Sequence, residues 1–226
     1  PSCNSSMTEA PTNAVPIRAS KFEHCIRRCM DCEIGASNTQ DAKSVTFIYR
    51  NPIANIPVEA RVGALDTLRT ALNVRNREKK ESYFGFSTSE DSVTWVVFDY
   101  LTRFNLLIPT LQRLALAPLN MQSSEASLLL WGVPVGASSR AAAVRERLVS
   151  ECMALGERPN SFSEPDVLVD LGDQGIVLIE VKYLSGNDNQ PAAYTNWSKY
   201  EARDRLTWRF DDVKSTGCYE LARYWC

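Results

Sequence analysis

Histidine is almost missing from this chain of 226 residues, which contains a single one, His24. Its scarcity argues against a Ser-His-Asp hydrolase and against nucleases that rely on histidine. Glycine-rich phosphate loops are missing too, because Gly132 to Gly136 and Gly172 to Gly175 match neither of the common nucleotide-binding fingerprints. Whatever chemistry the chain carries must therefore use other side chains.

Long apolar runs are also absent. The most apolar stretches, such as Ile176 to Val181, have the length of a strand, whereas a membrane-spanning helix needs roughly 18 residues. A signal peptide would need a basic start and an apolar core, and Pro1 to Ser20 has neither. We therefore expect a cytoplasmic protein with no membrane partner.

An excess of positive charge, the usual mark of a nucleic-acid-binding domain, is lacking as well. The net charge is −2 and the pI is about 5.6, although Arg75 to Lys80 and Arg140 to Arg147 are locally basic. With 44% hydrophobic and 23% charged residues, the composition is that of a globular protein. A cleavage site rich in carboxylates would itself lower the total charge, so these values do not exclude a nuclease.

Three segments follow one another along the chain. Residues 1–20 are rich in Ser, Pro, Thr and Asn and are expected to form a disordered tail. Residues 21–80 are expected to form a largely helical extension, and residues 81–226 the main domain. Within the extension, spacing and composition predict a short helix, a strand, a helix and a basic linker: Lys21–Cys32, Ser44–Tyr49, Ala60–Val74 and Arg75–Glu81.

The main domain begins with the best helical pattern in the chain. Its apolar residues recur every three or four positions on one face: Val93, Val96, Val97, Tyr100, Leu101 and Phe104. Ser87 and Glu90 have the spacing of a capping box, which predicts a helix start there. A strand over Ala126–Val133 and a helix over Ser138–Leu155 follow, so that the order of elements indicates an α/β fold.

A hairpin comes next, with strands over Asp166–Leu171 and Gly175–Tyr183 joined by a glycine-bounded turn. The second strand is apolar on both faces as far as Ile179, which predicts a central, buried strand. Glu180 and Lys182 then share one side of that strand, because side chains alternate along it.

The hairpin brings Asp166 within reach of Glu180 and Lys182. A carboxylate in apolar surroundings needs a partner, and a hard divalent cation with oxygen ligands is one. The alternative is a surface hairpin whose end carries an ordinary ion pair, a contact worth at most about 1 kcal/mol.

The pattern Pro165-Asp166 followed by Glu180-Val181-Lys182 resembles the signature of the PD-(D/E)XK nuclease superfamily, which has the restriction-endonuclease-like fold. The resemblance covers roughly residues 84–226. It implies a central mixed sheet flanked by helices and a Mg²⁺ (or Mn²⁺) site at one end of the sheet. It also implies hydrolysis of phosphodiester bonds in DNA by a metal-activated water.

The resemblance assigns roles to single residues. Asp166 and Glu180 would be metal ligands, the main-chain carbonyl of Val181 a further ligand, and Lys182 the catalytic lysine. Many members place an acidic residue on the first core helix, and Glu90 is the match, although a capping role explains it equally well. The family core ends with a helix and a strand; Tyr219–Cys226 looks like the beginning of that helix, so we expect a core truncated at its C-terminus.

The implied partner is nucleic acid, with DNA expected first and a homodimer as one assembly. An alternative is a catalytically inactive nuclease-like module that binds nucleic acid or a partner protein.

A second cluster of reactive residues is His24-Cys25 with Cys29 and Cys32. On a helix, the three cysteines would share one face, and with His24 or Cys3 they could bind Zn²⁺. A redox-active Cys29-x-x-Cys32 pair is another possibility. Free or buried thiols are the default in a chain without a secretion signal, and a zinc-binding adaptor is the third functional alternative.

Overall fold

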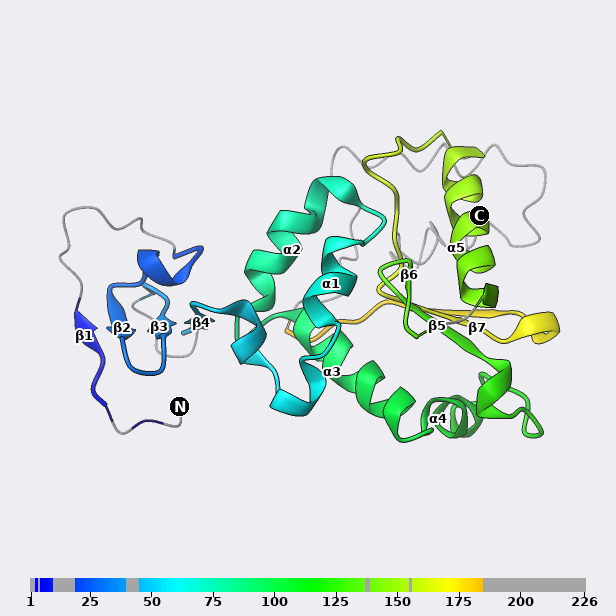
Figure 1. Cartoon of the computed structure of the whole chain (residues 1–226), viewed down its shortest axis with the longest axis horizontal. Helices are drawn as coiled ribbons and strands as arrows, with labels where there is room; N and C mark the ends of the chain where they lie inside the picture. The colour runs from blue at the N-terminus through cyan, green and yellow to red at the C-terminus, as the bar shows by residue number, and fades with distance from the viewer. Residues whose placement is uncertain are drawn as a thin grey trace, which may run out of the picture. The chain divides into compact units, whose positions relative to one another are not determined.

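The computed structural model describes residues 3, 5–9, 19–39, 45–136, 139–154 and 156–184 (Figure 1). Two compact units divide the chain. Unit 1 comprises Pro1–Thr70 and Arg75–Thr110, and unit 2 comprises Ala71–Val74 and Leu111–Cys226. The sequence predicts that the main domain begins at residue 81. In the structure, the longer segment of unit 2 begins at Leu111.

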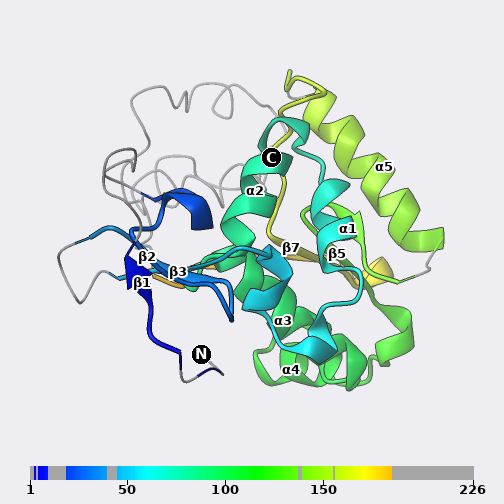
Figure 2. The same cartoon turned by 60° about the vertical axis from the view of Figure 1, so that its left-hand side comes forward.

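Unit 1 contains a four-stranded antiparallel sheet in which strand order follows chain order (Figure 2). Its strands are β1 (Thr8–Glu9), β2 (Arg27–Cys29), β3 (Ile34–Ala36) and β4 (Phe47–Tyr49). The strand expected over residues 44–49 is thus confirmed in its second half. β1 pairs with β2 through Thr8 and Arg28, so the expectation that residues 1–20 lack structure is wrong at this point.

The short helix predicted over residues 21–32 is wrong. Only a 3₁₀ turn, η2 (Phe22–His24), forms there, and the chain then enters β2. The side chain of Asn38 explains the change. Its Oδ1 accepts the Ile26 N–H at 2.8 Å and its Nδ2 donates to the His24 carbonyl at 2.9 Å. These bonds occupy backbone groups that a helix would need.

Helices form the remainder of unit 1. They are η4 (Pro52–Asn55), η5 (Val58–Ala60), α1 (Ala64–Arg69), α2 (Arg77–Phe84) and α3 (Glu90–Arg103), with η6 (Val74–Asn76) and α4 (Leu107–Arg113) crossing between the units. The helix predicted over residues 60–74 is therefore confirmed only as the shorter α1. The basic linker predicted over residues 75–81 is wrong, because most of it belongs to α2.

Helix α3 is confirmed as an element, but its start and its buried face differ from the prediction. Ser89, not Ser87, is the N-cap, and its hydroxyl accepts the Ser92 N–H. Trp95 and Phe98 form the buried face, and the Trp95 indole donates to the Ala60 carbonyl at 2.5 Å. On the predicted face, three residues are exposed: Val97 (45%), Tyr100 (52%) and Phe104 (55%). The bulkier aromatic pair, at its own i, i+3 spacing, determines which side is buried.

Unit 2 is built on a second antiparallel sheet, with the order β6-β5-β7-β8. Its strands are β5 (Ser127–Leu130), β6 (Val133–Pro134), β7 (Val167–Asp170) and β8 (Ile176–Ile179), with the 3₁₀ turns η7 (Ser123–Glu125) and η8 (Gly172–Gln174). These elements confirm the α/β class and the predicted hairpin. The strand predicted over residues 126–133 is confirmed only as β5, because residues 131 and 132 form a turn into β6. Every pairing among the described strands is antiparallel; the expected helix from Tyr219 lies outside the described residues.

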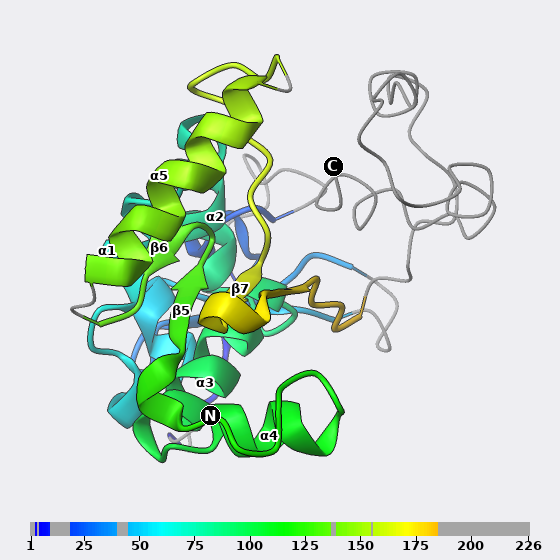
Figure 3. The same cartoon turned by 90° about the vertical axis from the view of Figure 1, so that its right-hand side faces the viewer.

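Helix α5 (Ser139–Ala154) packs along this sheet (Figure 3). It confirms the helix that the sequence predicts over residues 138–155. Its Ala141 is fully buried against Leu129 and Leu168, and Val144 and Leu148 extend the contact. Sheet and helix thus enclose an apolar cluster beside β5 and β7. No helix in the described part of the chain has both the length and the apolar character needed to cross a membrane.

The prediction that the Glu180 strand is central and buried is wrong among the described strands. β8 is the edge strand, with Ile176 48% exposed and the next three residues half-buried. β7 has a neighbour on each side and is buried at every position. An apolar run on both faces fits either strand, so the sequence alone assigned the central place to the wrong member of the hairpin.

A tight turn between β5 and β6 is hydrogen-bonded to two other segments of unit 2. Trp131 and Gly132 both have positive φ, 49° and 70°, as a type I′ turn requires. The Trp131 N–H donates to the Asp166 carbonyl at 3.1 Å, and the Trp131 carbonyl accepts the Leu72 N–H at 3.1 Å. The turn is therefore hydrogen-bonded both to Leu72, in the segment 71–74, and to Asp166, the residue that precedes β7.

Replacing Leu129 by alanine should test this packing. Leu129 is fully buried in the cluster with Ala141 and Leu168, so Leu129→Ala should lower the free energy of unfolding by about 2–5 kcal/mol. Leu119, 87% exposed in the same unit, gives the matched control, and Leu119→Ala should stay within about 0.5 kcal/mol of the parent. Urea denaturation measures both, and equal effects would contradict the assigned core.

Candidate functional site

The candidate site lies where β7 begins and β8 ends. The two strands pair with Val167 opposite Ile179 and Asp170 opposite Ile176. Asp166 directly precedes Val167 and Glu180 directly follows Ile179, so each lies one residue beyond the same end of the paired region. Both carboxylates therefore belong to one end of the hairpin, which is called the rim below.

Asp166 is held at this rim from two directions. Its Oδ2 accepts the backbone N–H of Val181 at 2.9 Å, across the gap between the strands. Its carbonyl accepts the Trp131 N–H. Pro165, buried immediately before it, has no N–H to leave without a partner at the start of the strand. The carboxylate therefore has a fixed position beside the segment that carries Glu180 and Lys182.

Glu180 and Lys182 form an ion pair just beyond the end of β8. Glu180 Oε1 lies 2.8 Å from Lys182 Nζ, and the two side chains are 15% and 24% exposed. The strand predicted over residues 175–183 is confirmed only over Ile176–Ile179. Because both groups are largely shielded from water, their attraction is screened less than that of a surface pair.

The donor set fits a hard divalent cation. Two carboxylates and one ammonium carry a formal charge of −1, and the Val181 carbonyl adds a neutral oxygen next to them. Mg²⁺ binds through one or two carboxylates together with waters and substrate phosphate. The rim is also partly open to solvent, since Asp166, Glu180 and Lys182 are all of intermediate exposure. Ions and substrate can thus reach these residues.

Two nearby carboxylates were not anticipated and have structural roles. Asp170 is buried at the far end of β7, where its Oδ2 lies 2.5 Å from Arg140 Nε and its Oδ1 accepts the Gly172 N–H at 3.1 Å. Glu164 accepts the Asn73 N–H through Oε2 at 2.7 Å. Asp170 lies two residues before Gly172, a position where an Asp that caps the turn could have been expected.

Glu90 is the first residue of α3 and belongs to unit 1, whereas Asp166, Glu180 and Lys182 belong to unit 2. Its assignment as a further metal ligand therefore stays a prediction. The capping box with Ser87 is wrong, because Ser89 caps the helix and Ser87 exchanges hydrogen bonds with Phe47 of β4. A carboxylate in the first turn still interacts favourably with the helix dipole.

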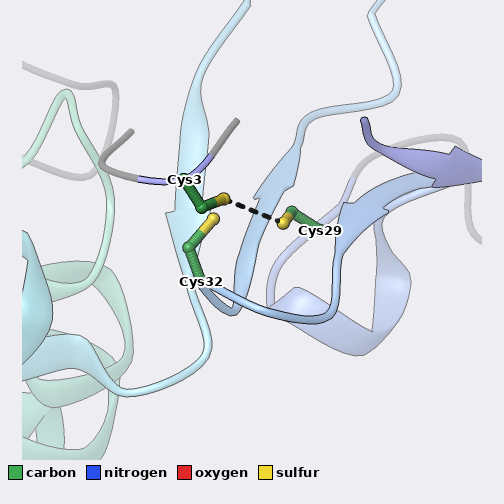
Figure 4. A group of neighbouring side chains, drawn as sticks. All are labelled: Cys3, Cys29 and Cys32. Carbon is green, nitrogen blue, oxygen red and sulfur yellow. Dashed lines mark hydrogen bonds between the residues drawn. The ribbon is translucent and has the colours of Figure 1, made fainter. Parts of the chain in front are cut away.

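The second candidate cluster differs in membership from the prediction. The Sγ atoms of Cys3, Cys29 and Cys32 lie within 4.8 Å of one another, and those of Cys3 and Cys29 are 3.4 Å apart (Figure 4). Cys25 is excluded: it is fully buried, and its sulfur contacts the Lys21 carbonyl at 3.7 Å. His24 is not a member either, and its Nδ1 lies 3.0 Å from Ser20 Oγ.

The thiols differ in acidity. A hydrogen bond from the backbone N–H of Cys32 is the main cause that lowers the pKa of Cys29, with further bonds from the Cys32 and Cys3 side chains. Burial raises the pKa of Cys32 to about 11 and also raises the pKa of Cys25 to about 11. Of Cys29 and Cys32, Cys29 is therefore the thiol with the lower pKa.

Substitution can separate the structural carboxylate from the candidate ligand. Asp170→Ala leaves the Gly172 N–H without its acceptor and should lower the free energy of unfolding by about 1–3 kcal/mol. Asp166→Asn keeps a side-chain oxygen for the Val181 N–H and should change stability by less than about 1 kcal/mol. Urea denaturation of the two variants checks this, and a larger loss for Asp166→Asn would reverse the assignment.

Comparisons with known proteins add no relative. No protein-family description, no curated protein and no solved structure matches the chain. The site is therefore defined by its own geometry.

Proposed function

We propose that unit 2 is a metal-dependent nuclease that hydrolyses phosphodiester bonds, with DNA as its substrate. The observation that carries the proposal is the convergence of Asp166, Glu180 and Lys182 at one rim. The Asp166 carboxylate bonds the backbone of Val181, and Glu180 pairs with Lys182 at 2.8 Å. An aspartate, a glutamate and a lysine in this order on adjacent strands are what the PD-(D/E)XK resemblance requires.

The arrangement of strands also supports the proposal. β5, β7 and β8 are consecutive, antiparallel neighbours in the sheet. The resemblance implies a core that begins with a helix and three strands and has a Mg²⁺ site at one end of the sheet. Asp166 directly precedes β7 and Glu180 directly follows β8, and α5 is then an additional helix between β5 and β7.

The proposed roles follow from the chemistry of each group. Asp166 and Glu180 would hold a Mg²⁺ or Mn²⁺ ion, together with the Val181 carbonyl. Such an ion polarises the phosphoryl oxygen and lowers the pKa of a bound water. Lys182 has three N–H donors, and an ammonium group suits hydrogen bonding to a water nucleophile or a phosphate oxygen at the same rim. Its positive charge would offset the negative charge that develops on the phosphoryl group.

The ion pair with Glu180 has a further consequence for Lys182. The contact at 2.8 Å fixes the position of the ammonium group at the rim. From there Lys182 would orient or deprotonate the water nucleophile. Glu180 in turn keeps the long lysine side chain in one place.

Substitution of Lys182 tests the mechanism. Lys182→Ala should reduce cleavage of DNA in Mg²⁺ by at least about 100-fold, since general-acid/base and electrostatic groups of this kind contribute factors of that order. Asp173 is an exposed acid in the turn of the same hairpin, and Asp173→Asn should retain activity. Single- and double-stranded substrates would be assayed with and without EDTA. Full activity in Lys182→Ala would remove Lys182 from the mechanism.

Metal binding distinguishes an active enzyme from an inactive nuclease-like module. Millimolar Mg²⁺ or Mn²⁺ should raise the Tm of the parent protein, because an ion that binds only the folded state stabilises it. The rise should vanish in Asp166→Asn and persist in Asp173→Asn. If none of the three proteins responds to either ion, the inactive binding module becomes the better description.

A further inference from the structure

We propose that unit 1 contains a structural zinc site in which the thiolates of Cys3, Cys29 and Cys32 are the protein ligands. The site lies in a different unit from the Asp166 rim and uses sulfur rather than oxygen donors. The inference is therefore independent of the proposed nuclease activity. Thiolate ligands are characteristic of structural zinc sites, whereas Mg²⁺ prefers oxygen.

The spacing of the sulfur atoms suits zinc. With a Zn–S distance of about 2.3 Å, two sulfurs of a tetrahedral site lie about 3.8 Å apart. The Cys3 and Cys29 sulfurs are 3.4 Å apart, and all three sulfurs lie within 4.8 Å of one another. In Figure 4 the three side chains point toward one another, with Cys29 and Cys32 at the turn between β2 and β3 and Cys3 on a separate piece of backbone. Small adjustments of side-chain torsions would complete the geometry.

The turn between β2 and β3 brings Cys29 and Cys32 together. Cys29 ends β2, Met30 and Asp31 separate it from Cys32, and Glu33 has a positive φ of 54° before β3 begins. Two cysteines separated by two residues have a spacing that is typical of structural zinc sites.

A disulfide would account for less of this arrangement. It joins two sulfurs at about 2.05 Å and would leave the third thiol of the cluster without a role. A metal ion uses all three at once. Among the His, Cys, Asp and Glu side chains of the described residues, no fourth belongs to the group. The remaining position of a tetrahedral ion would be completed by water or another ligand.

A metal ion bound by these cysteines would stabilise the sheet of unit 1. Its strands are only two or three residues long, and a small apolar group supports it: Phe22, Cys25, Ile34, Ala36 and Ile48. Cys3 is 26 residues from Cys29, so a shared ion would close a long loop and hold β1 beside β2. Small domains with limited cores commonly depend on a metal or a disulfide for stability.

Zinc analysis of the complete 226-residue chain tests the site. Protein purified under reducing conditions without chelator should contain one zinc per chain by plasma mass spectrometry. Cys29→Ser and Cys32→Ser should each lose most of it. Cys152, a buried cysteine in unit 2, provides the matched control, and Cys152→Ser should keep the full amount. Zinc at background level in the parent, or unchanged in both variants, would overturn the assignment.

Cobalt substitution keeps the inference testable even if a variant fails to fold. Unaltered protein, stripped of metal and titrated with Co²⁺, should develop sulfur-to-cobalt charge-transfer absorption and the intense d–d bands of a tetrahedral ion, saturating at one equivalent. Zn²⁺ should abolish both. Cys3→Ser should weaken the charge-transfer band by about one third, because it removes one of three thiolates. Absence of these bands in the unaltered protein would disprove the site.

Discussion

The antiparallel register between β7 and β8 is the constraint on which the candidate site depends. Because strand side chains alternate, a slip of one residue would turn Glu180 and Lys182 away from Asp166. The turn between the strands prevents such a slip. Gly172 and Gly175 both have positive φ, 71° and 118°, and the Leu171 N–H donates to the Gly175 carbonyl at 2.8 Å. Glycine is favoured at both positions, so the chemistry at one end of the hairpin depends on backbone freedom at the other.

The elements that could be predicted are those whose local pattern and tertiary contacts agree. The hairpin of unit 2 is bounded by its glycines, and α5 has a continuous helical pattern. Helix α3 shows where local patterns are insufficient, because two apolar stripes wind around it and only packing selects the one with Trp95 and Phe98. The same holds for β8, since an apolar run does not reveal whether a second neighbour pairs with it.

The two candidate sites differ in how far sequence could specify them. Asp166, Glu180 and Lys182 lie within one hairpin, so alternation and turn position suffice to bring them together. The thiol cluster needs Cys3, which joins Cys29 through the pairing of β1 with β2. Spacing alone would place Cys25, Cys29 and Cys32 on one helix face, but the chain is extended there and Cys25 faces the core instead. Long-range pairing is the information that a local pattern lacks.

The four residues Ala71–Val74, held by the turn at Trp131, give unit 2 a discontinuous chain. Leu72 packs in a cluster with Cys152 and Phe162, although the 36 residues Arg75–Thr110 of unit 1 separate residues 71–74 from Leu111. A shortened protein that starts at residue 81 or 111 would lack the Leu72 side chain, so Cys152 and Phe162 would lose an apolar contact. During synthesis on the ribosome, residues 71–74 emerge before Trp131, Cys152 and Phe162, the residues that they contact. Unit 2 is thus not a portable module, because part of its packing comes from residues 71–74.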